Sequence, residues 1–271
     1  MWLKKGYDFV QAKHDFNSPD AVIRLGVGKN MVASIRYWLK AFGLYDGTNT
    51  TQIADYLFDE ETGRDKYLED IASLQLLHFY LVHREEATLY NMLFCGLQRE
   101  RLSFDKEQVQ SYVELRMAEE GKKKVYNANT VKKDISVFLL NYSVPRRQCS
   151  NEDFSSLMID LEMIRQYSED KEGYYFNQEG KRQIMQSVFV HALLTLQEES
   201  QDLSLPFETI QDKIGLSFCM NEMESIEMLR SLSENYPNIL SYSDVAGIRQ
   251  IQFTGTTDKM KVLDDYYDTH K

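Results

Sequence analysis

Residues 18–44 have the sequence SPDAVIRLGVGKNMVASIRYWLKAFGL, and the order of its segments decides the fold class. Ser18-Pro19-Asp20 is typical of a helix start, because proline suits the first helical position. Ala21–Leu25 is therefore predicted as a short helix, and Gly26-Val27-Gly28 as the turn that ends it. A longer helix is predicted from about Asn30 to Phe42. This order of short helix, tight turn and longer helix predicts a helix-turn-helix unit.

The longer helix has two different faces. Apolar residues at helical spacing predict a buried stripe of Met31, Ile35, Trp38 and Phe42. The opposite face carries basic residues around a small residue, with an amide beside them: Lys29, Arg36, Lys40, Ala33 and Asn30. Small side chains allow a helix to approach a DNA groove closely, and basic residues at both ends can contact phosphates. We predict that this face binds DNA; the alternative is a solvated face on a core helix.

A second unit of this kind is predicted around Tyr126–Tyr142. Asn129 or Thr130 can cap its helix, and its apolar stripe consists of Val131, Ile135, Phe138 and Tyr142. Basic residues off that stripe and in the preceding loop are Lys122, Lys123, Lys124, Lys132 and Lys133. Positive charges this close together favour a phosphate partner. The alternative is a solvated basic loop.

Residues 203–253 predict a third unit, with the helix, turn, helix and hairpin order of a winged helix. The two helices are predicted at Leu205–Ile214 and from the cap Asn221 to about residue 235. The hairpin strands are predicted at Ile239–Tyr242 and Ile248–Phe253, joined by a five-residue loop. The second helix carries four acids: Glu222, Glu224, Glu227 and Glu234. Because acids repel phosphate, we interpret this unit as structural or protein-binding.

The net charge of −11 is unfavourable for a nucleic-acid binder, but the charges are segregated along the chain. Residues 21–40 contain four basic residues and no acid, and residues 122–147 contain seven basic residues and one acid. Residues 152–180 contain eight acids against two basic residues. A chain segmented in this way can present one basic face although its sum is acidic.

The predicted architecture is mainly α, with several helix-turn-helix or winged-helix modules and a small C-terminal β-hairpin wing. We divide it into an N-terminal unit (1–50), a helical domain with the second basic unit (51–148), and an acidic linker plus winged-helix-like domain (149–271). His78 lies in the apolar run 71–81. A buried, hydrogen-bonded histidine is favoured there over a catalytic or metal-binding one.

Several other classes of protein are disfavoured. The three cysteines, Cys95, Cys149 and Cys219, are far apart and form no Cys-x-x-Cys pair, which argues against a disulfide framework or zinc ribbon. No apolar run is long enough to span a membrane, and the first residues do not resemble a secretory signal, so we expect a cytoplasmic protein. Gly26-Val27-Gly28-Lys29-Asn30 lacks the spacing of a phosphate-binding loop.

Nuclease chemistry requires carboxylates that hold Mg²⁺ against a phosphate. Acid pairs that could supply them are Glu69-Asp70, Glu152-Asp153 and Asp160 with Glu162. Asp105 with Glu120-Gly121-Lys122 only loosely resembles a restriction-type pattern, because it lies in a polar loop. Solvated carboxylates remain the default for each, so catalytic and metal-binding residues stay unassigned.

Several strings together resemble the SspB-like family of bacterial proteins, which long carried only a domain-of-unknown-function label. They are WLKKG (2–6), LGVGKNMV (25–32) followed by SIRYW (34–38), YLED (67–70), LLHF (76–79), TVKKDI (130–135) and GIRQI (247–251). The resemblance spans nearly the whole chain. Family members usually carry a His-Glu-containing stretch and an arginine just upstream of WLKKG. In this chain that string stands at residues 2–6, so no role of those upstream residues is carried over.

SspB-like proteins accompany a cysteine desulfurase, an ATPase and a sulfurtransferase, and together these install phosphorothioate sulfur in DNA for antiphage defence. The resemblance implies a Mg²⁺-dependent DNA nicking endonuclease with those three proteins as partners. The residues by themselves leave a second hypothesis open, a non-catalytic winged-helix DNA-binding adaptor or transcriptional regulator.

Overall fold

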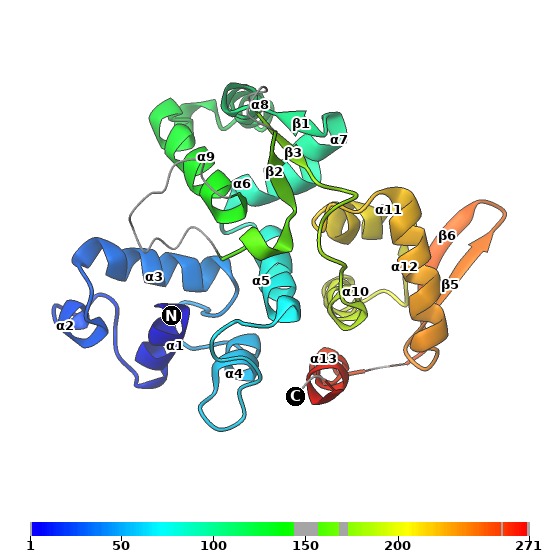
Figure 1. Ribbon diagram of the computed structural model, residues 1–271, viewed down its shortest axis with the longest axis horizontal. Coiled ribbons are helices and arrows are strands. Elements are labelled where there is room, and N and C mark those ends of the chain that lie inside the picture. The colour runs from blue at the N-terminus through cyan, green and yellow to red at the C-terminus, as the bar shows by residue number, and fades with distance from the viewer. Residues whose placement is uncertain (1, 144–156, 168–172, 256, 270–271) are drawn as a thin grey trace.

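Helices dominate the structure (Figure 1), as the composition and periodicity predicted. The computed structural model describes residues 2–143, 157–167, 173–255 and 257–269. It adds two three-stranded antiparallel sheets to the helices. None of the helices in these ranges is both long and apolar enough to cross a membrane.

The N-terminal part consists of α1 (Trp2–Gln11), α2 (Ala21–Leu25), α3 (Lys29–Ala41) and α4 (Gln52–Phe58). The predicted short helix, turn and long helix are therefore present. Gly26 ends α2 in the left-handed conformation, with φ +64°, which glycine adopts at little cost.

The predicted buried stripe of α3 is partly wrong. The fully buried residues are Val32, Ile35, Leu39 and Ala41, with Phe42 directly after the helix, whereas Met31 and Trp38 are only half-buried. The reason is α1, which the sequence analysis did not predict and which packs closely on α3. A Cβ atom on Gly6 of α1 would lie 2.6 Å from Ile35 and 2.7 Å from Leu39. This contact turns the buried face of α3 toward α1.

The central part begins with α5 (Ile71–His83), in which 11 of 13 residues are buried. The elements after it are α6 (Thr88–Asn91), the π-helix η1 (Met92–Leu97), α7 (Gln98–Glu100), β1 (Ser103–Phe104), α8 (Lys106–Glu119), the 3₁₀ turn η2 (Lys123–Val125) and α9 (Ala128–Tyr142). Helices α8 and α9 pack against each other. The N-cap of α9 is Asn127, not Asn129 or Thr130, because the Asn127 side chain accepts hydrogen bonds from both of their backbone N–H groups.

A short 3₁₀ turn η4 (Ile159–Leu161) leads into β2 (Ile164–Gln166) and β3 (Tyr174–Phe176). These strands form a sheet of order β1-β3-β2, in which Ser103 of β1 pairs with Tyr175 of β3. The sheet thus joins residues from either side of the predicted boundary at 148/149. One continuous hydrophobic core includes residues from all three predicted domains.

The C-terminal part consists of α10 (Gln186–Ser200), β4 (Ser204–Pro206), α11 (Phe207–Ile210), the π-helix η5 (Gln211–Gly215), α12 (Glu222–Asn235), β5 (Leu240–Val245), β6 (Ile248–Phe253) and α13 (Lys259–Thr269). Its sheet has the order β4-β6-β5. In Figure 1, α12 and the β5–β6 hairpin lie at the opposite end of the molecule from α2 and α3.

Two local predictions in this part need correction. The helix predicted at Leu205–Ile214 begins only at Phe207, because Leu205 pairs with Ile251 in the sheet. The five-residue hairpin loop is wrong as well: β5 continues to Val245, and only Ala246 and Gly247 form the turn. Both have positive φ, 53° and 81°, which matches the right-handed twist of paired strands.

His78 is fully buried, as predicted, and both ring nitrogens are hydrogen-bonded. Its Nε2 donates to the Ser217 carbonyl at 2.6 Å, and its Nδ1 accepts from the Tyr142 hydroxyl at 2.7 Å. Burial lowers the pKa of His78 to about 4, so the ring is neutral and structural at neutral pH.

Candidate nucleic-acid interface

Helices α2 and α3 and the preceding segment enclose a cleft of about 820 Å³. Four of the eight residues predicted to bind DNA line it: Lys29, Asn30, Arg36 and Lys40. The remaining polar and aromatic residues of its lining are Asn17, Ser18, Phe16 and Tyr37. The structure therefore brings the basic residues of the first unit together on one surface.

The start of α3 favours an anion. Gly28, its N-cap residue, offers no side chain to the first N–H groups, and the first turn contains no acid. Lys29 occupies the first helical position instead, where the helix dipole opposes a positive charge. A bound phosphate would satisfy both the N–H groups and the Lys29 ammonium.

Arg36 crosses the cleft. Its guanidinium Nη1 donates a hydrogen bond of 2.8 Å to the Asn17 Oδ1 on the opposite wall. Asn17 is itself held by Asp15, whose Oδ1 accepts from the Asn17 backbone N–H at 2.9 Å and from its side-chain amide at 3.0 Å. Asn17 was not predicted from the sequence, because a loop residue has no periodicity that indicates where its side chain lies.

The basic residues of the cleft keep their charges available. Within the described ranges, no ion pair involves Lys29, Arg36 or Lys40, although Arg24 of α2 pairs with Asp20. On a chain of net charge −11, an external anion binds most favourably beside a cation that no carboxylate neutralises.

Tyr37 lines the cleft and is 43% exposed. Its ring packs edge-on against Trp38 at 5.3 Å between centroids. Trp38 in turn contacts Tyr90 of α6, which contacts Phe138 of α9. Burial raises the pKa of Tyr37, and the charges of Asp134 and Glu86 raise it further.

The second predicted basic group lies elsewhere. The exposed residues Lys122, Lys123, Lys132 and Lys133 belong to the α8–α9 connection and to α9, and they do not line the cleft on α3. Lys122 forms an ion pair of 2.8 Å with Glu120. The eight predicted residues thus form two groups rather than one site.

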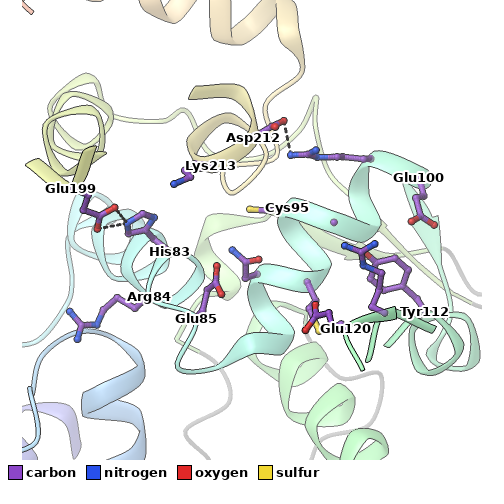
Figure 2. A pocket seen from close by; sticks show the side chains of 15 residues that line it. His83, Arg84, Glu85, Cys95, Glu100, Tyr112, Glu120, Glu199, Asp212 and Lys213 are labelled. Atoms are coloured by element: carbon purple, nitrogen blue, oxygen red, sulfur yellow. Dashed lines mark hydrogen bonds and ion pairs between the residues drawn. The ribbon is translucent and has the colours of Figure 1, made fainter. Parts of the chain in front are cut away.

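A different cleft, of about 830 Å³, lies between α5, the π-helix η1 and the π-helix η5 (Figure 2). Its charges are largely paired: His83 contacts Glu199 at 2.8 Å, and Arg99 contacts Asp212 at 2.6 Å. The Cys95 sulfur points into this cleft, but burial raises the pKa of its thiol to about 12. A protonated thiol is a poor nucleophile, so this cleft does not have the chemistry of a cysteine-dependent active site.

The described side chains do not fit the Mg²⁺ that the SspB-like resemblance implies. No group of three or more His, Cys, Asp or Glu side chains in the described ranges could hold a metal ion. Glu69 and Asp160 line one cleft of about 400 Å³, but Arg182 also lines it and would repel a cation.

The other acids considered as ligands do not improve the fit. The Asp70 carboxylate caps α5 and accepts a hydrogen bond from the Tyr266 hydroxyl, and Glu162 pairs with Arg165. Glu152 and Asp153 lie outside the described residues. The described residues therefore do not form a protein-only magnesium site, and we assign no ligand.

The described residues define a mainly helical protein with a cleft lined by basic residues of α3. The chain belongs to the family described as a protein of unknown function, DUF4007, whose model matches residues 1–267. Among curated proteins, no sequence relative matches the chain.

Two crystal structures of SspB, one of them bound to a magnesium ion, are similar to the chain with a TM-score of 0.82 each. They are 24% and 23% identical to it, and each comparison covers 98% of this chain and 84% of the SspB chain. The chain therefore has the fold of SspB. Together with the family match, this confirms the resemblance to SspB-like proteins.

Proposed function

We propose that this protein is a DNA-binding component of a bacterial DNA phosphorothioation system and that the cleft on α3 contacts the DNA backbone. The observation that carries the proposal is the convergence of Lys29, Arg36 and Lys40, unpaired among the described residues, in one cleft of an acidic chain. The SspB fold supports the link to sulfur modification.

The segregation of charge supports one orientation on DNA. The acidic helix α12 lies at the far end of the molecule from the cleft (Figure 1), so its carboxylates stay away from a bound phosphodiester. The sheet order β4-β6-β5 with the helices before it is that of a winged helix, and we propose such a module here. Its exposed Val245 and Ile248, which pair across the hairpin turn, suit contact with a protein rather than with DNA.

Partners of that module would be the other proteins of the sulfur-modification system. The family resemblance proposes a cysteine desulfurase, a sulfurtransferase and an ATPase. Co-purification with the hairpin variant Val245→Lys tests the contact: loss of a partner that the unmodified chain retains would support it, and unchanged capture of all three would refute it.

Anisotropy of a labelled DNA of about 12 nucleotides, offered both as a duplex and as its separate strands, tests DNA binding. We expect binding that weakens steeply with salt, because each phosphate contact releases counterions. The triple variant Lys29→Gln/Arg36→Gln/Lys40→Gln should lose most of that affinity.

A matched control changes Lys5, Lys106 and Lys261 to glutamine, three exposed lysines outside the cleft and outside the second basic group. It removes the same charge but should weaken binding much less than the cleft variant. If the unmodified protein bound neither form of DNA at low salt, the proposed function would be wrong. If the two triple variants lost affinity equally, only the net charge would matter and the cleft assignment would fail.

A second candidate function, Mg²⁺-dependent nicking, is favoured by the fold shared with a magnesium-bound SspB crystal structure. Its test is the conversion of supercoiled plasmid to the open-circular form with Mg²⁺, compared with the same reaction in EDTA. Open-circular product only with Mg²⁺ would support nicking. Intact plasmid over a wide range of protein concentration would leave a non-catalytic DNA-binding adaptor or transcriptional regulator as the function.

A further inference from the structure

The cationic stripe of α3 is partly recessed, because Arg36 and Lys40 are half-buried while Lys29 is exposed. It forms the floor of the cleft, whose opposite wall is the segment Phe16–Pro19 with Ala21 and Val22 of α2. The hydrogen bond of 2.8 Å from Arg36 to Asn17 ties floor and wall together.

This geometry disfavours a duplex at the floor of the cleft. A recognition helix enters a major groove about 12 Å wide, so its reading face must be the outermost part of the protein. In α3, the wall stands beside that face and Arg36 is already bonded to it. A duplex can reach the exposed Lys29 and Ala33, whereas the half-buried Arg36 and Lys40 lie deeper beside the wall.

The volume points to a smaller unit of nucleic acid. The cleft measures about 820 Å³. Protein pockets that bind drug-sized ligands measure about 300–1,000 Å³. The cleft therefore has room for about one or two nucleotides of an extended strand, with the chain entering and leaving over its rim.

The chemistry of the lining separates a phosphate side from a base side. With 3.6 residues per turn, Lys29, Arg36 and Lys40 form one stripe along α3, and Asn30 and Tyr37 lie about a quarter of a turn around the helix. Burial raises the pKa of Tyr37, and the negative charges of Asp134 and Glu86 raise it further. Those negative charges disfavour a phosphate beside Tyr37 but not a neutral base. An exposed aromatic ring beside a line of cations is the arrangement that single-strand binders use.

From these observations we infer that the α3 cleft binds a single DNA strand, with phosphates on Lys29, Arg36 and Lys40 and one base stacked on Tyr37. This inference rests on the proposed DNA-binding function and specifies its substrate class. Asn30 and Asn17 can donate and accept hydrogen bonds at the edges of the bases or sugars.

The test measures anisotropy of four labelled ligands of about 12 nucleotides: a single DNA strand, its duplex, the same strand as RNA, and a strand of abasic sites. We expect the single DNA strand to bind about 10-fold more tightly than the duplex. Tyr37→Ala should weaken binding of that strand by about 10-fold, because a stacked base is lost. Tyr37→Phe, which keeps the ring, should stay within about twofold of the unmodified protein.

Two controls make the assignment specific. Tyr67→Ala removes a tyrosine with 67% exposure that does not line the cleft, and it should leave affinity unchanged. The abasic strand should bind the unmodified protein and Tyr37→Ala equally, since it has no base to stack. Lys29→Gln should lower the slope of log affinity against log salt by about 0.7, the value for one phosphate contact in a single strand.

The outcomes separate this inference from the function on which it rests. Tighter binding of the duplex, equal losses in Tyr37→Ala and Tyr67→Ala, or tighter binding of RNA would each overturn the single-strand DNA inference while DNA binding stands. Failure of every ligand to bind would overturn both. Far-ultraviolet circular dichroism of each variant confirms that the exposed substitutions leave the fold intact.

Discussion

Two buried histidines make the stability of this protein sensitive to mild acid. His78 lies between Ser217 and Tyr142, and burial lowers its pKa to about 4. His191 donates from Nδ1 to the Lys259 carbonyl at 3.1 Å and accepts from the Tyr80 hydroxyl at 2.9 Å, and burial lowers its pKa to about 4 as well.

The direction of the effect follows from proton binding. The unfolded chain binds a proton on each histidine below about pH 6.5, whereas the folded chain binds none until about pH 4. The contribution of the two neutral histidines to the free energy of unfolding is therefore fully present above pH 6.5. That contribution is lost as pH falls from 6.5 toward 4. At pH 5, about 1.5 units below the unfolded pKa, each histidine costs about 2 kcal/mol, since one unit is worth about 1.4 kcal/mol.

The substitution His78→Gln isolates the pH-dependent contribution of one histidine to stability. An amide can still donate to Ser217 and accept from Tyr142, but it does not titrate. Urea denaturation at pH 7 and at pH 5 gives the free energy of unfolding of both proteins. We expect the unmodified chain to lose about 4 kcal/mol between these pH values through the two histidines, and the variant to lose about 2 kcal/mol less.

A loss between pH 7 and pH 5 that is the same in His78→Gln as in the unmodified chain would refute the reasoning for His78. If that variant fails to fold, His191→Gln gives an independent measurement of the same kind. Most carboxylates titrate below pH 5, so this window reports mainly on histidine.

Three further predictions concern the fold and the second cleft. Gly6→Ala should destabilise the protein by about 1–3 kcal/mol in urea, because its Cβ would overlap Ile35, whereas Gly28→Ala, with nothing within 4 Å, should change stability little; equal losses would contradict the α1–α3 packing. Ala246→Gly should raise stability by about 0.5–1 kcal/mol by thermal denaturation, because Ala246 has φ +53° and glycine is unstrained there; a lower midpoint would argue against this turn. Cys95 should react with iodoacetamide at pH 8 far more slowly than a free thiol, since its pKa is about 12; peptide mass mapping that showed equal rates would contradict the raised pKa.

Sequence periodicity located three of the long helices, α3, α9 and α12, but could not say what covers them. The apolar and basic stripes of α3 follow directly from the positions of its residues, and so does its start after Gly28. Which apolar residues are most deeply buried depends on α1, because Gly6 brings that helix onto Ile35 and Leu39. Spacing within one helix contains no information about the direction from which another helix arrives.

The short strands illustrate the same limit. Strands β1, β2 and β3 contain two or three residues each, too few for an alternating pattern to be recognised. They exist because Phe104, Ile164 and Phe176 are buried together in one sheet. The hairpin turn at Ala246-Gly247 was missed because alanine rarely adopts positive φ, so the sequence lacks the usual turn pair.

The sequence by itself determined the helical class, the basic face of α3 and the buried, hydrogen-bonded position of His78, because local periodicity and side-chain chemistry specify these directly. Only the tertiary structure decided that Asn17 forms the wall opposite Arg36 and that the lysines of α9 lie outside that cleft. A cleft has two walls from separate parts of the chain, and their approach depends on long-range packing rather than on the spacing of neighbouring residues.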